Sequence, residues 1–437
     1  MMKVCVQGLW HLGSVTAACL ATVGHQVVGL DSKVATIDLL SNGKAPIFEP
    51  GLDEAIGAGL TSGNLIFSFD PGLAVAGVQV LWVAFDTPVD DEDRADVAFV
   101  QAQVQAVLPH LAEGAVVLVS SQLPVGSIRE LEAFANQHLA AKRLSFACSP
   151  ENLRLGNALD VFLNPDRVVV GVRDAQTQLI LEELLAPITD RVEWMSVESA
   201  EMTKHAINAF LATSVTFANE IAAICEFVGA DAKEVERGLK TEARIGPKAY
   251  VSPGGPFAGG TLARDIAFLG QESQAHHLAS PLLSAVSPSN DEHKNWVRRK
   301  LLQEFGAQNG IAVAIWGLTY KPGTDTLRRS LAVELCDWLL EQGAKVWVFD
   351  PAVKQLPDRW VGKVIHCATA LEAVVQAQAL VIGTEWPEFK PLASELATKA
   401  RPGLVLVDAN RHLQAQLLPE SFKYIAVGMP LSRWGQK

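Results

Sequence analysis

The stretch of residues 196–229 is the feature that most constrains the fold of this chain. It contains no glycine or proline before Gly229 and is rich in alanine, leucine, isoleucine and phenylalanine. This composition predicts a long helix, with Glu198 and Glu201 near its positive N-terminal end and Gly229 as its stop. Because residues 202–218 are apolar or small on nearly every side, we expect that part of the helix to be buried.

Two polar residues interrupt this apolar helix. Lys204 and Asn208 are four residues apart, so they lie one above the other on a single face. A buried lysine is costly unless a partner offsets its charge. The pair is therefore either a structural lysine, which reaches the surface or forms a salt bridge, or the lining of a reaction site.

Length and composition limit the class of protein. A chain of 437 residues is too long for one core, so two or three domains are expected. The net charge of −12 argues against a nucleic-acid partner or an anionic membrane surface. The six cysteines have no paired spacing, so we predict neither a metal site nor a disulfide scaffold. No apolar run approaches membrane-spanning length and the N-terminus leads straight into a strand, which makes the cytoplasm the expected location.

The chain begins with the pattern of a dinucleotide-binding βαβ unit. A strand, a glycine turn, a helix, a second strand and an acidic residue follow one another at residues 3–7, 8–13, 14–24, 25–30 and 31. Gly8 permits the tight turn, Gly13 permits close helix–strand packing, and Asp31 is placed to bond the ribose hydroxyls. Trp10 stands where a glycine normally lets the backbone approach the pyrophosphate. The pattern predicts a Rossmann fold but leaves the pose of the cofactor open.

Further strands alternate with amphipathic segments and predict a doubly wound parallel sheet. The strand candidates are residues 81–85, 115–120, 144–149 and 167–172. Loops at residues 85–88, 120–126 and 149–154 follow three of these strands. Each loop alone is explained as a turn, but ligands of such sheets bind at the carboxyl ends of strands, so three loops on one rim indicate a site.

The second half of the chain predicts a smaller α/β domain. Residues 253–265 form a glycine-rich segment that we expect to be a loop over a ligand, and residues 280–295 are expected to be a turn into the last domain. Strands are then predicted at residues 311–318, 345–351, 379–384 and 404–410. The first turn of this domain lacks the spacing of a dinucleotide site. Lys321, Arg328 and Arg411 either grip phosphates or form a solvated face.

A family resemblance is carried by many short motifs in family order. They are residues 46–52 (PIFEPGL), 124–126 (PVG), 150–151 (PE), 164–168 (NPDRV), 198–204 (ESAEMTK), 208–211 (NAFL), 244–246 (RIG), 320–322 (YKP) and 384–388 (TEWPE). With these motifs the chain resembles the UDP-glucose/GDP-mannose 6-dehydrogenases along essentially its whole length. The resemblance implies an α/β protein with two Rossmann-like doubly wound domains joined by a long central helix. It implies an NAD-binding domain at 1–195, a central helix with dimer contacts and a substrate loop at 196–300, and a nucleotide-sugar-binding domain at 301–437.

The resemblance also implies an activity. Those enzymes oxidise the C6 alcohol of a nucleotide sugar to a carboxylate with two NAD⁺, through an aldehyde. The implied catalytic positions are Lys204, Asn208, Asp265, Glu151 and Thr261. The implied cofactor-binding residues are Gly8, Trp10, Leu12, Gly13, Asp31, Thr87, Gln122, Glu151 and Arg328. The implied substrate-binding residues are Glu151, Leu153, Lys204, Asn208, Arg244, Phe257, Gly259, Lys321 and Arg411. The implied partners are a nucleotide sugar, above all a UDP-sugar, and a second copy of the chain, in polysaccharide biosynthesis.

The chain departs from the family pattern in its chemistry. Thr261 occupies the place of the nucleophilic cysteine, and a hydroxyl without a dedicated base is a far poorer nucleophile than a thiolate. Gln122 replaces a threonine that helps to position water, and Asp86 replaces a glycine. The family's Arg-Glu-Ser-Pro reads Arg-Arg-Ser-Leu at residues 328–331. Cys148 is the only nearby thiol, and a cysteine at a strand end is usually part of the core.

Three functions therefore stay open. The chain is an oxidoreductase that transfers hydride from a nucleotide sugar to NAD⁺ without covalent catalysis, a conventional four-electron dehydrogenase with another nucleophile, or a non-enzymatic binder of nucleotide sugars. Trp10 and Thr261 are the strongest arguments for the third.

Overall fold

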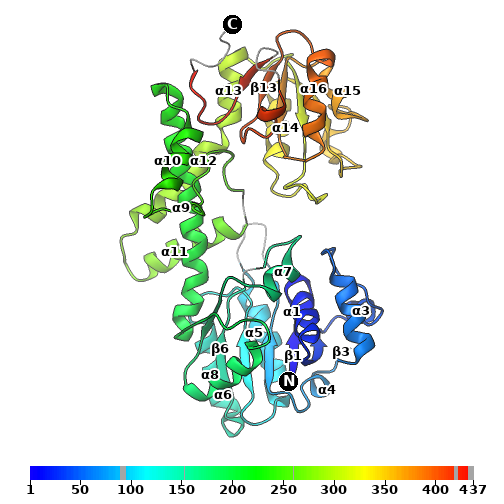
Figure 1. The fold of residues 1–437 in the computed structure, drawn as a ribbon, viewed down its shortest axis with the longest axis vertical. Helices are drawn as coiled ribbons and strands as arrows, with labels where there is room; N and C mark the ends of the chain where they lie inside the picture. Colours follow the sequence, from blue (N-terminus) through cyan, green and yellow to red (C-terminus); the bar gives the residue numbers. More distant parts are fainter. Residues whose placement is uncertain (89–94, 152, 259, 418–421, 432–437) are drawn as a thin grey trace. The chain divides into compact units, whose positions relative to one another are not determined.

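The chain forms two compact units in a computed structural model, residues 1–207 and 208–437 (Figure 1). The structure describes residues 1–88, 95–151, 153–258, 260–417 and 422–431. The boundary between the units lies within one helix, α9 (Val197–Val228). The expected division into residues 1–195, 196–300 and 301–437 stays a prediction.

The first unit is built on an eight-stranded sheet in the order β3-β2-β1-β4-β5-β6-β7-β8. Its strands are β1 (Lys3–Gln7), β2 (Gln26–Leu30), β3 (Leu65–Ser68), β4 (Val80–Val83), β5 (Val116–Val119), β6 (Ser145–Cys148), β7 (Val168–Gly171) and β8 (Val192–Met195). The first six follow the 3-2-1-4-5-6 order of a dinucleotide-binding fold and are parallel. The predicted parallel sheet is therefore confirmed as far as β6. It is wrong beyond that strand, because β7 pairs antiparallel to β6 at Cys148 and Gly171.

Helices cover both faces of this sheet. They are α1 (His11–Thr22), α2 (Val34–Ser41), α3 (Leu52–Ser62), α4 (Pro71–Ala74), α5 (Val97–Val107), α6 (Ser127–His138), α7 (Ala158–Leu163) and α8 (Ala175–Leu185). One core joins the sheet to α1, α2, α3, α7 and α8, and a second core joins its other face to α4, α5, α6 and the start of α9. The central strands are near-continuous apolar runs because both of their faces are buried, and so they were predictable from the sequence. The edge strands β3 and β8 are only partly buried and were not predicted.

The helix α9 is the long helix that the sequence predicts. Its expected burial is wrong on one side, because Met202, Phe210 and Phe217 are 39%, 70% and 48% exposed. The expectation that no run approaches membrane-spanning length is also wrong. The helix has 32 residues and an 18-residue window with a mean hydropathy of 1.3, 44% of it buried. A buried core helix satisfies the same criteria of length and composition, so this finding is weak support for a membrane span.

The second unit contains a helical region before its sheet. The helices are the remainder of α9, α10 (Ala232–Thr241), α11 (Thr261–Ala275), α12 (Pro281–Lys294) and α13 (Trp296–Phe305). The expected turn at residues 280–295 is wrong, since this segment is the helix α12, which begins with Pro281 and tolerates Pro288 inside it. The expected loop at residues 253–265 is wrong in its last part. Helix α11 begins at Thr261, and Asp265 on that helix is only 1% exposed.

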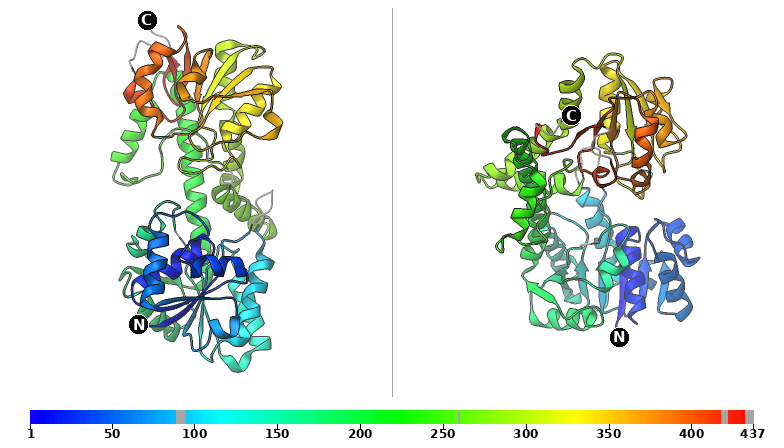
Figure 2. Two further views of the ribbon diagram at one scale, coloured as in Figure 1. Left: turned by 90° about the vertical axis from the view of Figure 1, so that its right-hand side faces the viewer. Right: turned by 45° about the horizontal axis from the view of Figure 1, so that its top comes forward.

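The second sheet belongs to the yellow to red part of the chain in Figure 2. It is entirely parallel in the order β11-β10-β9-β12-β13-β14, again 3-2-1-4-5-6. Its strands are β9 (Ala312–Trp316), β10 (Lys345–Phe349), β11 (Val364–His366), β12 (Ala379–Ile382), β13 (Val405–Val407) and β14 (Lys423–Ile425). Helix α14 (Leu331–Glu341) and the C-terminal part of α9 pack on one face, and α15 (Ala370–Val374) and α16 (Phe389–Lys399) pack on the other. The expected second α/β domain is confirmed.

Candidate active site

The glycine turn after β1 has the close packing that its sequence predicts. Gly8 has a φ of +90°, and a Cβ on it would lie 2.6 Å from the ring of Phe85. A Cβ on Gly13 would lie 1.7 Å from the carbonyl oxygen of Gly8, so the turn and the first turn of α1 touch there. Only glycine fits at both positions.

Asp31 at the end of β2 holds this turn. Its carboxylate accepts hydrogen bonds from the backbone amides of Leu9 and Lys33, both at 2.9 Å. The carboxylate thus lies beside the turn, where an acidic residue of a Rossmann fold bonds the ribose of a dinucleotide. These residues fit the adenosine end of the cofactor.

The diphosphate end of the same site is already in contact with a carboxylate. Asp86, in the loop after β4, accepts a hydrogen bond from the backbone amide of Leu12 at 3.0 Å. Withdrawal of its carboxyl group from water raises the pKa of Asp86, against the hydrogen bond from Leu12 that lowers it, although the residue as a whole is exposed. Trp10 precedes α1 and is 51% exposed. The residues fit a diphosphate here only when the Asp86 carboxylate leaves the amide.

The loops after β4, β5 and β6 meet at one rim of the sheet, as the sequence predicts. The hydroxyl of Thr87 donates to the backbone carbonyl of Gln122 at 2.9 Å. Beneath the rim lies a cavity of about 20 Å³, which has room for about one water molecule. The cavity is lined by Val119, Ser120, Ser121, Gln122, Leu123, Ile128, Cys148, Pro150, Glu151, Glu201, Lys204 and His205.

Lys204 points into this rim. Its ammonium nitrogen donates to the backbone carbonyl of Glu151 at 2.6 Å and lies 3.4 Å from the Glu151 carboxylate. The Glu151 carboxylate also accepts from the amide of Leu153 at 2.7 Å. The Lys204 side chain is 12% exposed, so it neither reaches the surface freely nor lies in an apolar core. The structure thus brings together three residues that the sequence singled out.

Two further side chains in the cavity were not predicted as site residues. Glu201 is buried and accepts from the backbone amides of Gly126 and Ile128 at the positive end of α6. His205 contacts the backbone carbonyl of Leu123 through Nε2 at 3.0 Å. Both lie one turn apart on α9 and flank Lys204, and that spacing is the sequence signal that could have revealed them.

Cys148 is part of the core, as its position at a strand end indicates. The side chain is buried against both the sheet and the cavity. Burial raises the pKa of its thiol far above the ordinary value, which keeps the sulfur protonated and unreactive.

A second unpredicted group braces the glycine turn. Glu49, from the PIFEPGL motif, has a fully buried carboxylate that contacts His11 Nε2 at 2.8 Å. The same carboxylate accepts from the amides of Gly156 and Ala158, both at 2.9 Å, where α7 begins. Burial works to raise the pKa of Glu49, but these hydrogen bonds outweigh it and lower the pKa. One carboxylate therefore ties the start of α1 to the segment that follows Glu151.

In the second unit, Asn208 and Asp265 form a buried pair. The Asn208 amide donates to the Asp265 carboxylate at 2.5 Å, and the two residues are 6% and 1% exposed. Phe257 is buried beside them in the core formed by α9, α11 and α12, and its backbone is held by Asn290. Gly259 lies outside the described residues.

Thr261 has no sign of activation. It is the exposed first residue of α11, and within the described part of the chain its hydroxyl makes no hydrogen bond to a basic group. A threonine hydroxyl in water is protonated at neutral pH. The position is therefore exposed and chemically ordinary.

The turn after β9 differs from the turn after β1, although both follow the first strand of a Rossmann sheet. Asp350 at the end of β10 corresponds to Asp31, but it is buried and accepts hydrogen bonds from Leu318, Thr319 and the indole of Trp386. Its remaining oxygen accepts from two further backbone amides. Because Asp350 is buried, its carboxylate is not available for a ribose, whereas the carboxylate of the partly exposed Asp31 is accessible.

Basic residues of this unit have different surroundings. Lys321 is partly exposed, and Arg328 is exposed on a cavity of about 320 Å³ that Arg329 and Arg359 also line. The Arg244 side chain is 88% exposed and pairs with Glu242. Lys321, Arg328 and Arg244 are thus accessible to a charged ligand.

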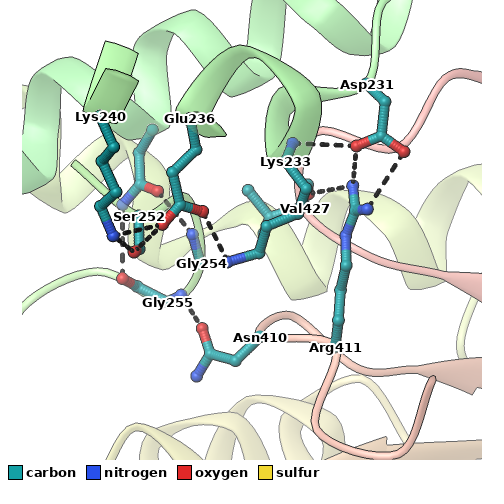
Figure 3. A network of polar contacts seen from close by, with 11 residues as sticks. Asp231, Lys233, Glu236, Lys240, Ser252, Gly254, Gly255, Asn410, Arg411 and Val427 are labelled. Carbon is teal, nitrogen blue, oxygen red and sulfur yellow. Dashed lines mark hydrogen bonds and ion pairs between the residues drawn. The ribbon is translucent and has the colours of Figure 1, made fainter. Parts of the chain in front are cut away.

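Arg411 is instead buried in an ion pair. Figure 3 shows its guanidinium against the Asp231 carboxylate, with nitrogen–oxygen distances of 2.8 and 3.1 Å, and a bond to the carbonyl of Val427 at 3.3 Å. Its neighbour Asn410 accepts from the amide of Gly255 at 2.6 Å and donates to Glu385. Contacts that hold Arg411 in the fold compete with any role in gripping a substrate.

Comparisons with known proteins agree with this arrangement. Models of the UDP-glucose/GDP-mannose dehydrogenase family match residues 2–189 (NAD binding domain), 198–292 (central domain) and 314–415 (UDP binding domain). A UDP-glucose 6-dehydrogenase of Rhizobium meliloti (strain 1021) is 33% identical over 98% of this chain and 100% of the relative. The chain belongs to the UDP-glucose/GDP-mannose dehydrogenase family.

Other members of the family extend this likeness. A UDP-glucose 6-dehydrogenase of Pseudomonas aeruginosa is 32% identical, over 98% of each chain. The solved structure of a UDP-glucose dehydrogenase from Pyrobaculum islandicum has a TM-score of 0.86 and 28% identity, over 98% of each chain. The cofactor is NAD, as the match to the NAD binding domain shows. Among the residues that the structure describes, no three metal-binding side chains gather in one place.

Proposed function

We propose that this chain oxidises an alcohol of a nucleotide sugar, in the manner of a UDP-glucose 6-dehydrogenase, without a covalent thioester step. The observation that carries the proposal is the pairing of Lys204 with Glu151 at the carboxyl rim of the Rossmann sheet. Bound NAD⁺ would supply the acceptor for the hydride. A UDP-sugar is the proposed substrate because residues 314–415 match a UDP binding domain.

The ammonium group of Lys204 is suited to stabilise negative charge on the reacting sugar oxygen. Three features favour this role: the side chain is largely withdrawn from water, it is held by a backbone carbonyl, and its carboxylate neighbour is at 3.4 Å rather than in a close ion pair. A cation in a low-dielectric site acts more strongly on a nearby oxygen than one in water. Glu151 is placed to accept a proton from the ammonium or from a water molecule in the cavity.

The covalent route of the family lacks its nucleophile in this chain. Thr261 is exposed and not activated, and the Cys148 thiol is buried and protonated. Hydride transfer needs no thiol, and a hydrated aldehyde can donate a second hydride directly. We therefore propose that the reaction stops at the aldehyde or ketone, or continues through the hydrate.

A second copy of this chain is the proposed protein partner. Six large apolar side chains of α9 are exposed, Met202, Phe210, Phe217, Ile224, Phe227 and Val228. Phe210, Phe217 and Ile224 recur every seven residues. A stripe with this spacing on one helix packs against the same stripe of a second copy around a twofold axis. We place this dimer in the cytoplasm, in polysaccharide biosynthesis.

The test is the number of NADH molecules formed per UDP-glucose consumed, with the sugar product identified by mass spectrometry. The proposal predicts NADH formation that survives Thr261→Ala and thiol alkylation. One NADH per sugar with an aldehyde product, or two with an acid and no covalent adduct, supports it. A covalent enzyme–sugar thioester trapped during turnover would show the conventional mechanism instead.

A non-catalytic binder of nucleotide sugars is the second candidate function. Two features favour it, the contact between Asp86 and Leu12 and the exposed Trp10. Both disfavour binding of a diphosphate at this end of the cofactor site. Binding of UDP-glucose without binding of NAD⁺, measured by calorimetry, would select this candidate.

A further inference from the structure

The first turn of α1 is the natural anion site of the first unit. Backbone amides at the start of a helix carry partial positive charge, and the Rossmann fold places the diphosphate of a dinucleotide there. In this chain the amide of Leu12 at that turn donates to the carboxylate of Asp86. The carboxylate is thus where the diphosphate belongs.

The position of Asp86 in the fold makes this contact possible. The residue follows β4, which pairs directly with β1, so its loop faces the turn that leads from β1 into α1. Phe85 packs against Gly8 in the same turn, which brings the backbone of Asp86 close to the helix end. The contact therefore follows from the strand order and from the presence of an acidic residue at this position.

Two negative groups cannot share this helix end without cost. The Asp86 carboxylate carries one negative charge, and a dinucleotide diphosphate carries two at neutral pH. Two negative charges a few ångströms apart repel each other. The Glu151 carboxylate adds further negative charge near Asp86 and works to raise the pKa of Asp86. His11 has the opposite effect and works to lower that pKa.

We propose that Asp86 sets the affinity of this chain for NAD by occupying the diphosphate seat on α1, from which the cofactor has to displace it. The proposal does not depend on the proposed function, because the cofactor follows from the match to the NAD binding domain. Asp86 is then an affinity-determining residue that weakens cofactor binding, and its removal strengthens binding without any new contact.

The experiment measures NAD⁺ binding to the full chain by calorimetry for the wild type, Asp86→Asn and Asp86→Gly. The asparagine keeps the shape of the side chain and removes its charge, and the glycine removes the occupant. We expect Asp86→Asn to lower the Kd for NAD⁺ about tenfold or more and Asp86→Gly to lower it at least as much. Adenosine, which has no phosphate, should bind all three proteins equally.

Asp174→Asn is the matched control. Asp174 also places its carboxylate on a helix amide, that of Thr177 at the start of α8, but it lies away from the glycine turn. This variant should bind NAD⁺ as the wild type does, and thermal unfolding should show that every variant is folded.

The outcomes separate this inference from the proposed function. If the Asp86 variants bind NAD⁺ no more tightly than the wild type while UDP-glucose is oxidised, the inference is wrong and the proposed function stands. If they bind more tightly and no sugar is oxidised, the inference stands and the proposed function fails. If neither the wild type nor any variant binds NAD⁺, both are wrong.

Discussion

The ammonium nitrogen of Lys204 lies 2.6 Å from the backbone carbonyl oxygen of Glu151 and 3.4 Å from its carboxylate. The two residues are 53 positions apart in the chain, one on α9 and the other after β6. These two contacts offset the free-energy cost of burying a charged side chain in an apolar helix, and they hold the ammonium group beside a small cavity. It explains why the lysine is tolerated there.

Lys204→Met should reduce turnover strongly. The substitution keeps the length and apolar stem of the side chain but removes the positive charge that we propose stabilises the reacting oxygen. Loss of one such group lowers kcat by about 10²–10³-fold. Steady-state NADH formation measures the effect. Lys44→Met on the surface is the control and should leave the rate unchanged. A Lys204→Met variant with an unchanged rate would contradict the proposed role.

Thr261→Ala should change kcat by less than about threefold, a factor that corresponds to only about 0.7 kcal/mol. Thr261 is the exposed first residue of α11 and is not part of a nucleophile–base pair, so removal of its hydroxyl should change the rate little. The measurement is kcat with UDP-glucose, with Thr261→Val as a second variant of the same shape as threonine. A loss of several hundredfold in both variants would show that the hydroxyl takes part in the chemistry.

Glu226→Gln should destabilise the second unit by about 3–5 kcal/mol. The Glu226 carboxylate accepts from Lys300 at 2.6 Å, from the indole of Trp296 at 2.8 Å and from the amide of Gly428 at 3.1 Å, all buried. The neutral amide removes the buried negative charge that faces the Lys300 ammonium. Urea unfolding measures the change, and removal of the exposed pair at Asp53 by Asp53→Asn should have little effect. Equal effects of the two substitutions would contradict the prediction.

Glu236→Gln should make the second unit less sensitive to acid. Burial works to raise the pKa of Glu236, but hydrogen bonds from Lys240, Ser252 and Lys233 outweigh it and lower the pKa to about 2 (Figure 3). Because the pKa in the folded state is below that of an unfolded glutamate, near 4.3, the ionised group stabilises the fold above that value. The stabilisation is lost as the pH falls from about 4.3 to about 2. Thermal unfolding across this range should therefore show a flatter pH dependence for the variant than for the wild type.

Phe217→Asp should convert the proposed dimer into a monomer. Phe217 is 48% exposed in the middle of the apolar stripe on α9, between Phe210 and Ile224. A carboxylate there faces its copy in a twofold interface and cannot be buried without cost. Sedimentation velocity measures the assembly, and Leu278→Asp, at an exposed position outside α9, is the control. A wild type that sediments as a monomer would contradict the proposal directly.

Local patterns in the sequence predicted most of the fold. The strands β1 and β9 were predictable because they are buried on both faces, and α9 was predictable because it lacks glycine and proline. The error at α12 arose because Pro288 reads as a break, whereas the packing of Val286, Asn290 and His293 holds the helix through it. The burial of α9 was overestimated because composition does not show which face a neighbour covers.

The sequence by itself determined the order of the elements, the two Rossmann units and the residue types available for chemistry, including the absence of a cysteine at position 261. These follow from periodicity and from the identity of single residues, which are local properties. Only the tertiary structure decided that Asp86 lies on the amide of Leu12, that Arg411 is held by Asp231, and that Glu49 braces the turn at His11. Each of these contacts joins residues 38 or more positions apart, and a carboxylate shows which amide or cation it serves only once the chain has brought the two together.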